Sequence, residues 1–197
     1  MTSPKVVPQR RHKSFEATHR EIIETAVRLI SEQGVGSLSI SAVARALGID
    51  RTTVYYHFDG REALIAAVKA WSSAELAKVF NQPDATQQEK IDYTTRFVLE
   101  NPELMKLWMD DFLSGVDIRQ SYPFWDQLVE GVRKDAAYEG HGSVDAEIYC
   151  VNLLTSSIIG PRVFRNSVAP AEDNETIVRR FGDERRRVLR LSSLLRE

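Results

Sequence analysis

The segment "LSISAVARALGIDRTTVYYHF", residues 38–58, predicts two short helices joined by a tight turn. Ser39 can cap a helix over about 40–47, because its hydroxyl can accept a hydrogen bond from a free backbone N–H of the first turn. Gly48 then supplies the positive φ that such a turn needs, without a steric cost. A second helix follows over about 51–58. Two short helices joined in this way are typical of a helix-turn-helix.

Small and apolar residues fall where the two helices must pack. Ala44 allows the helices to approach closely, and four apolar side chains are spaced to hold them together: Val43, Leu47, Ile49 and Val54. The second helix is left with a polar and aromatic surface, which suits the base edges and phosphates of a DNA major groove. An ordinary helical hairpin with exposed polar residues is the alternative reading of this segment alone.

Helical patterns continue on both sides of this segment. Thr18 with Glu21, and Asp59 with Glu62, each have the spacing of a capping box at a helix start. Gly34 predicts a helix end, because glycine readily takes the left-handed conformation found there.

The rest of the chain also reads as helices, separated by breaks. "NQPDAT" at 81–86 interrupts the pattern, Ser143 is placed to cap a long segment, and Gly160-Pro161 predicts a kink in it. A last helix is expected over about 172–195. No stretch shows sustained strand alternation. We therefore expect an all-α fold of about nine helices, with an N-terminal three-helix domain containing the helix-turn-helix and a C-terminal helical bundle.

Charge is distributed unevenly along the 197 residues. Residues 1–71 hold ten Lys/Arg against seven Asp/Glu, a balance of +3, whereas residues 72–197 hold sixteen against twenty-one, a balance of −5. The excess of positive charge is strongest in residues 1–17. A basic arm suits a polyanionic partner, although a solvated tail has the same composition.

Other classes of protein find little support in the sequence. A single cysteine, Cys150, excludes an internal disulfide framework, and no apolar run reaches membrane-spanning length, so a cytoplasmic protein is expected. The four histidines lack metal-ligand spacing, and no phosphate loop or catalytic motif is present. We expect neither a cofactor nor a metal, and we do not expect an enzyme.

Residues 18–70 resemble the DNA-binding domain of the TetR family of bacterial transcriptional regulators. The resemblance rests on "REIIETAVRLISEQG" and "LSISAVARALGIDRTTVYYHFDGREAL". Within them, the matching positions are Ala26, Gly34, Val43, Ala44, Gly48, Tyr55, Phe58 and a basic residue three beyond Phe58. Ser39 stands where the family often has threonine, and Arg61 where lysine is usual. Both substitutions conserve the chemistry.

The resemblance implies a role for each polar residue of the motif. Four residues would approach base edges: Arg51, Thr52, Thr53 and Tyr55. Two would approach phosphates or flanking bases: Tyr56 and His57. Three would contact phosphate: Ser39, Ser41 and Arg61. Phe58 is the exception, since it is expected to be buried between the motif and the rest of the domain.

The resemblance further implies a homodimer that binds a double-stranded DNA operator, most often as a repressor released by a small, mainly apolar effector. On this basis the chain divides into a flexible arm (1–17), a DNA-binding domain (18–66) and an effector-binding and dimerisation domain (67–197). The last two long helices are the expected dimer interface.

Nine residues are candidates for the effector pocket: Phe97, Met105, Trp108, Met109, Phe112, Trp125, Leu128, Tyr149 and Asn152. Such residues line apolar ligand sites, but they also fill ordinary cores. Two further alternatives remain open. One is an architectural or cell-division DNA-binding protein of the same fold without an effector, and the other is an all-α enzyme with an incidental hairpin.

Overall fold

The computed structural model describes residues 14–122, 124–138 and 144–194, and within these ranges the chain forms helices and turns but no strand. The α-helices are α1 (Phe15–Gln33), α2 (Ile40–Leu47), α3 (Arg51–His57), α4 (Arg61–Phe80), α5 (Gln87–Glu100), α6 (Pro102–Ser114), α7 (Ile118–Ser121), α8 (Trp125–Tyr138), α9 (Ala146–Ile158), α10 (Gly160–Val163) and α11 (Asn174–Leu194). A short 3-10 helix, η1 (Val35–Ser37), and a short π-helix, η2 (Phe164–Val168), complete the described elements. The predicted all-α fold is confirmed. Two of these helices, α7 and α10, have only four residues each, so the nine longer ones agree with the expected number.

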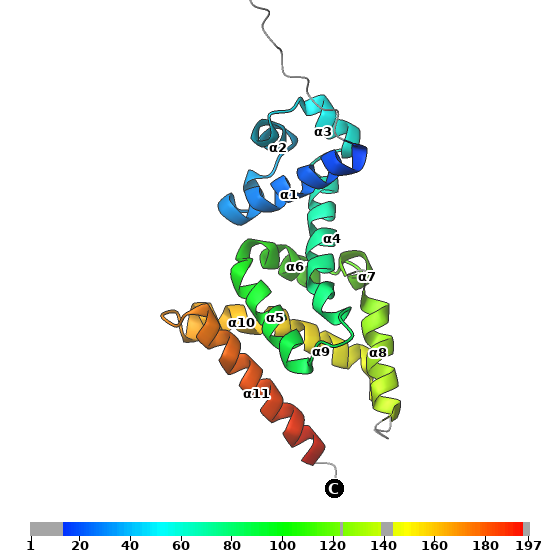
Figure 1. Cartoon of the computed structure of the whole chain (residues 1–197), viewed down its shortest axis with the longest axis vertical. Helices are drawn as coiled ribbons and strands as arrows, with labels where there is room; N and C mark the ends of the chain where they lie inside the picture. The colour runs from blue at the N-terminus through cyan, green and yellow to red at the C-terminus, as the bar shows by residue number, and fades with distance from the viewer. Residues whose placement is uncertain (1–13, 123, 139–143, 195–197) are drawn as a thin grey trace, which may run out of the picture.

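Helices α1–α3 gather at one end of the molecule, and α4 leads from them into a body formed by α5–α11 (Figure 1). α1 begins earlier than the sequence predicts, because the Ser14 hydroxyl accepts the backbone N–H of Ala17 at 3.2 Å. The predicted capping box of Thr18 and Glu21 was therefore wrong, since Thr18 already lies inside the helix. Residues 15–17, assigned to the flexible arm, are helical, and residues 1–13 lie outside the described residues.

The helix-turn-helix forms as predicted. Ser39 caps α2 by accepting the Ala42 N–H at 3.1 Å. Gly48 ends the helix with φ 65° and ψ 34°, and the N–H of Ile49 donates back to the Ala44 carbonyl at 3.0 Å. Because the turn takes a left-handed residue at Gly48, α3 can fold back across α2.

α4 is continuous from the helix-turn-helix into the body, so residue 66 marks no break in the chain. Gly60 precedes its first residue, and no side chain caps it. The predicted capping box of Asp59 and Glu62 was therefore wrong. Instead, the Glu62 carboxylate pairs with the Arg61 guanidinium at 3.1 Å.

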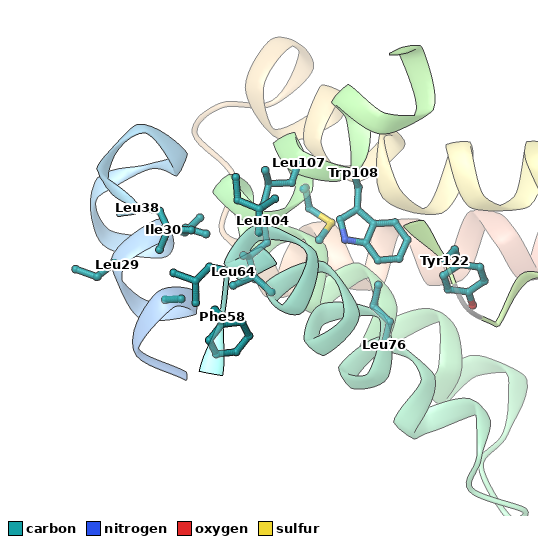
Figure 2. Packing of buried hydrophobic residues seen from close by; sticks show 14 of the residues in the cluster. Leu29, Ile30, Leu38, Phe58, Leu64, Leu76, Leu104, Leu107, Trp108 and Tyr122 are labelled. Carbon is teal, nitrogen blue, oxygen red and sulfur yellow. The ribbon is translucent and has the colours of Figure 1, made fainter. Parts of the chain in front are cut away.

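One apolar core runs along α4 and joins the two ends of the molecule (Figure 2). Phe58 and Leu64 lie at the end packed against α1, and Trp108 and Tyr122 lie at the other. Phe58 is buried, as predicted. The motif and the body therefore share one continuous core.

α6 packs against both α1 and α4 and is tied to α4 by polar contacts. The indole Nε1–H of Trp108 donates to the Ser72 hydroxyl at 2.9 Å, and both groups are buried. One turn further along, the Lys69 ammonium pairs with the Asp111 carboxylate at 2.6 Å. These contacts fix the position of α4 relative to the body.

The C-terminal helices follow the predicted breaks. Asp145 caps α9 by accepting two backbone N–H groups, whereas Ser143, the predicted cap, lies outside the described residues. The chain breaks at Gly160-Pro161, as predicted. α11 packs against α5, where Ile177 is fully buried, so this part of its apolar stripe is used within the chain. None of the described helices is both long enough and apolar enough to cross a lipid bilayer.

Candidate nucleic-acid interface and effector cavity

α3 presents a polar and aromatic face to solvent. Val54 is fully buried against the core, and this fixes the rotation of the helix. Thr52 and Tyr56 lie four positions apart, so they share the face opposite to the core. Tyr56 is 77% exposed and Tyr55 is 55% exposed. Large aromatic side chains held out in this way are available to a partner.

The first turns of α2 and α3 meet at this surface. The Arg51 guanidinium donates to the Ser41 hydroxyl at 3.4 Å, and the side chain of Arg51 is exposed. The Ser39 oxygen is used in capping α2, so its hydroxyl hydrogen remains available to donate. Thr53 is half-buried. The backbone N–H groups and hydroxyls gathered here are suited to phosphate oxygens.

Arg61 is turned toward the protein instead of away from it. Its guanidinium donates to the carbonyl oxygens of Leu38 at 3.0 Å and of Val35 at 3.1 Å. These carbonyls belong to η1 and to the residue that follows it, just before α2. In this arrangement Arg61 positions the start of the helix-turn-helix, and a phosphate contact by Arg61 stays a prediction.

His57 packs into a cluster of rings between α3 and α1. Its imidazole lies 4.3 Å from the Phe15 ring and 5.6 Å from His19, measured between ring centroids. Burial, together with the nearby His19, lowers the pKa of His57. The Nδ1 atoms of both histidines are buried without a hydrogen-bond partner. The expected phosphate contact of His57 also stays a prediction.

The nine predicted DNA-contacting residues therefore lie together on α2, α3 and the ends that flank them. The sequence analysis missed the ring cluster, although Phe15 and His19 have the i, i+4 spacing that places two side chains on one helix face. It also did not single out Arg45, an exposed cation in the last turn of α2.

A small cavity of about 70 Å³ lies among the helices of the body. The residues that line it are Leu76, Phe80, Lys90, Ile91, Thr94, Trp108, Tyr122, Leu128, Leu153, Leu154, Ser157, Ile158 and Arg185. A shallower groove between α9 and α11 adjoins it, and Ile91, Leu153 and Arg185 line both. The lining is mostly apolar, with two cations at its edge.

Four of the nine predicted pocket residues lie at these surfaces. Trp108 and Leu128 line the cavity, and Tyr149 and Asn152 line the groove. The other five line neither: Phe97, Met105, Met109, Phe112 and Trp125. Met105 and Trp125 are buried in the core, since their side chains are used in helix–helix packing. The sequence analysis did not select the other eleven of the thirteen residues that line the cavity, and five of these are aliphatic.

Tyr122 closes one side of the cavity. Its ring meets the Trp108 ring edge to face at a centroid distance of 5.6 Å. Burial raises the pKa of Tyr122 to about 12, so its hydroxyl stays protonated at neutral pH. Within the described ranges, no group of three or more His, Cys, Asp or Glu side chains is placed to hold a metal ion.

The model of the tetR family of bacterial regulatory proteins matches residues 22–68, which hold the helix-turn-helix. The HTH-type transcriptional regulator AcrR of Shigella flexneri is 31% identical over 64 residues, which are 32% of this chain and 30% of that protein. The HTH-type transcriptional regulator SrpR of Pseudomonas putida is 36% identical over 55 residues, 28% of this chain and 26% of that protein. The chain thus spans less than a third of the length of either relative.

Similarity of fold extends further than similarity of sequence. The solved structure of the fatty acid degradation regulator FadR from Bacillus halodurans matches with a TM-score of 0.62 at 16% identity, covering 87% of this chain and 95% of that one. At this identity the match shows a shared fold and no more. Together with the observed geometry of the motif, these findings place residues 22–68 in the tetR family of bacterial regulatory proteins.

Proposed function

We propose that the protein is a sequence-specific DNA-binding regulator of transcription. The observation that carries this proposal is the orientation of α3, which buries Val54 and holds Tyr56 and its neighbours in solvent. Side chains fixed in this way can reach base edges without first being ordered, which lowers the entropic cost of binding. The protein would act in the cytoplasm, where chromosomal DNA is accessible.

Dimerisation belongs to the same proposal. A helix-turn-helix protein reads a two-fold operator by placing two recognition helices about 34 Å apart. Ile148 and Val151 on α9 are 61% and 48% exposed, and their i, i+3 spacing places them on one face. An exposed apolar face on this helix supports an interface between two copies, formed by α9 and α11.

The cavity supports control by a small molecule. A ligand entering it would press on Trp108, whose indole is hydrogen-bonded to Ser72 of α4. Displacement of the indole would release α4, and α4 leads directly to the helix-turn-helix. We therefore propose that a mainly apolar effector changes the distance between the two recognition helices and releases the operator. The protein would then act as a repressor.

The test begins with selection of bound sequences from random duplex DNA, followed by affinity measurements on the selected operator. Thr52→Ala and Tyr56→Ala should each weaken binding by about 1–3 kcal/mol, the cost of one lost base contact. Leu113→Ala is the matched control, because Leu113 is 83% exposed on α6 in the body. Unchanged affinity in both α3 variants would contradict the proposed recognition surface. Many unrelated bound sites, without a preferred operator, would instead indicate an architectural protein.

A further inference from the structure

Within the described residues, one arginine beside the cavity donates its hydrogen bonds to neutral groups only. Arg185 of α11 is half-buried, and it lines both the cavity and the groove between α9 and α11. Its Nη2 donates to the Ser156 hydroxyl at 3.0 Å and, at 3.5 Å, to the Leu153 carbonyl. Desolvation by burial lowers the pKa of Arg185, yet a guanidinium remains charged at any physiological pH.

Nearby arginines on the same helix are arranged differently. Arg180 pairs with Glu172, Arg186 with Asp183, and Arg187 with Glu184. Among the described residues, Arg185 makes no such ion pair. A cation that is partly removed from water without a counter-charge is unfavourable, and an anion bound beside it would relieve that cost.

The surroundings of Arg185 combine this charge with an apolar surface. Leu154 and Ile158 of α9, and Leu76 of α4, supply aliphatic walls to the cavity, and Leu76 and Ile158 are buried. Lys90 of α5 adds a second cation to the lining. A molecule that filled this space would therefore meet both hydrocarbon and positive charge.

We propose that the effector is an amphipathic carboxylate whose apolar part enters the cavity and whose carboxylate is bound by the Arg185 guanidinium. Arginine suits this role because its planar fork can bind both oxygens of a carboxylate at once. The inference rests on the proposed function and specifies the ligand of the same site. The cavity of about 70 Å³ is smaller than the roughly 300–1,000 Å³ of most ligand pockets, so the ligand must widen it toward the groove. The apolar part of the ligand, inside the cavity itself, would press on Trp108, which lines it.

The experiment compares three probes of equal chain length on the full-length protein: octanoate, 1-octanol and octylamine, each below its aggregation concentration. Calorimetry gives the affinities, and thermal unfolding gives an independent measure. Octanoate should bind at least about tenfold more tightly than the other two, because a charge-assisted hydrogen bond to a partly desolvated cation favours the anion. Octyl phosphate as a fourth probe shows whether the site selects a carboxylate or any anion. Equal binding of octanoate and octanol, preferential binding of octyl phosphate or no binding of octanoate would each overturn the proposal.

Variants assign the selectivity to one residue. Arg185→Gln keeps a hydrogen-bond donor but removes the charge, so octanoate should lose its advantage over octanol. Arg185→Lys should retain part of it. Arg187→Gln is the matched control on the same helix, because Arg187 is exposed and paired with Glu184. A full octanoate preference in Arg185→Gln would overturn the proposal. If Arg185 instead pairs with a second copy of the chain, Arg185→Gln would weaken the dimer in sedimentation while the wild type shows no carboxylate preference.

Failure of the carboxylate inference can be distinguished from failure of the proposed DNA-binding function. Operator binding without octanoate selectivity would leave the DNA-binding role intact and remove this inference. Octanoate selectivity without operator binding would support the carboxylate site and contradict the proposed DNA-binding role. If both hold, octanoate should weaken operator binding by the wild type and by Arg187→Gln, but not by Arg185→Gln.

Discussion

Gly48 shows how one residue shapes the motif. Its φ of 65° lies in the left-handed region, but a Cβ added there would meet nothing within 4 Å. Glycine is therefore favoured at position 48 because of its backbone conformation, and not because a side chain would clash. Gly48→Ala should destabilise the protein by about 1–2 kcal/mol, the cost of the left-handed conformation for a residue with a Cβ. Urea unfolding measures this change.

Gly131 provides the matched control for this substitution. It lies inside α8 and also has open space around its Cα. Gly131→Ala should therefore stabilise the protein by about 0.5–1 kcal/mol, since alanine is the better helix former. Equal effects of the two substitutions would show that the turn does not depend on positive φ.

His57 makes stability depend on pH. Because burial and the neighbouring His19 lower its pKa in the folded state, the unfolded chain binds a proton more readily. The contribution of His57 to stability is thus complete above the unfolded pKa of about 6.5 and is lost as the pH falls through it toward the lower folded pKa. Thermal unfolding between pH 7.5 and 5 should show a smaller loss in His57→Gln than in the wild type. An identical loss in both would contradict the role of His57.

At the scale of single residues, the sequence predicts conformation better than contacts. Gly48 and Ser39 could be identified because their roles are local: a positive φ, and a hydroxyl three positions before an N–H. Arg61 could not, because its carbonyl partners lie more than twenty positions earlier in the chain. The same holds for His57, whose neighbours come from α1.

The contact between α4 and α6 joins the cavity to the DNA-binding end. If Ser72 becomes alanine, the buried indole N–H of Trp108 loses its acceptor, and a buried donor without a partner costs about 1–3 kcal/mol. Ser72→Ala should therefore destabilise the protein by this amount in urea unfolding. It should also reduce the effect of octanoate on operator affinity, because Trp108 loses its hydrogen bond to α4.

Ser114→Ala is the control for this contact. Ser114 is the last residue of α6, it is exposed, and its hydroxyl donates to the Asp111 carbonyl of the same helix. The same replacement there should change stability by no more than about 0.5 kcal/mol, as is usual for surface positions, and should leave the response to ligand intact. A Ser72→Ala protein as stable and as responsive as Ser114→Ala would show that the hydrogen bond between Ser72 and Trp108 does not connect the two sites.

At the scale of elements, the sequence predicts the helices well and their starts less well. The breaks at 81–86 and at Gly160-Pro161 were correct, because proline and glycine act locally. Two predicted capping boxes were wrong, since a polar residue with a Glu three positions later need not lie at a helix start. A third box, Thr86 with Glu89, exists in the structure but was not predicted. The lining of the cavity was harder to predict, because its residues come from several helices. A local sequence pattern does not determine how these helices are rotated relative to one another.

At the scale of the whole molecule, the proposed dimer requires an interface between two copies. The apolar stripe of α11 is partly used within the chain, since Ile177 packs against Leu99 of α5. Exposed apolar positions near the expected interface include Ile148 and Val151 of α9 and Val188 of α11, so two of these three lie on α9. Such residues are enriched at the centre of obligate interfaces. We therefore expect α9 to supply the main apolar contact of the dimer.

The double variant Ile148→Asp with Val151→Asp tests this expectation. Two like charges on each copy would have to be desolvated at the interface, so the variant should sediment as a monomer where the wild type sediments as a dimer. Operator affinity should fall about 100-fold or more, because the second half-site is no longer bound as an intramolecular event. Leu113→Asp, at a still more exposed apolar position on α6, should change neither property. A double variant that stays dimeric would move the interface away from α9. A monomer with full operator affinity would instead remove the two-fold recognition on which the proposed switch depends, because a ligand could then no longer act by changing the distance between two recognition helices.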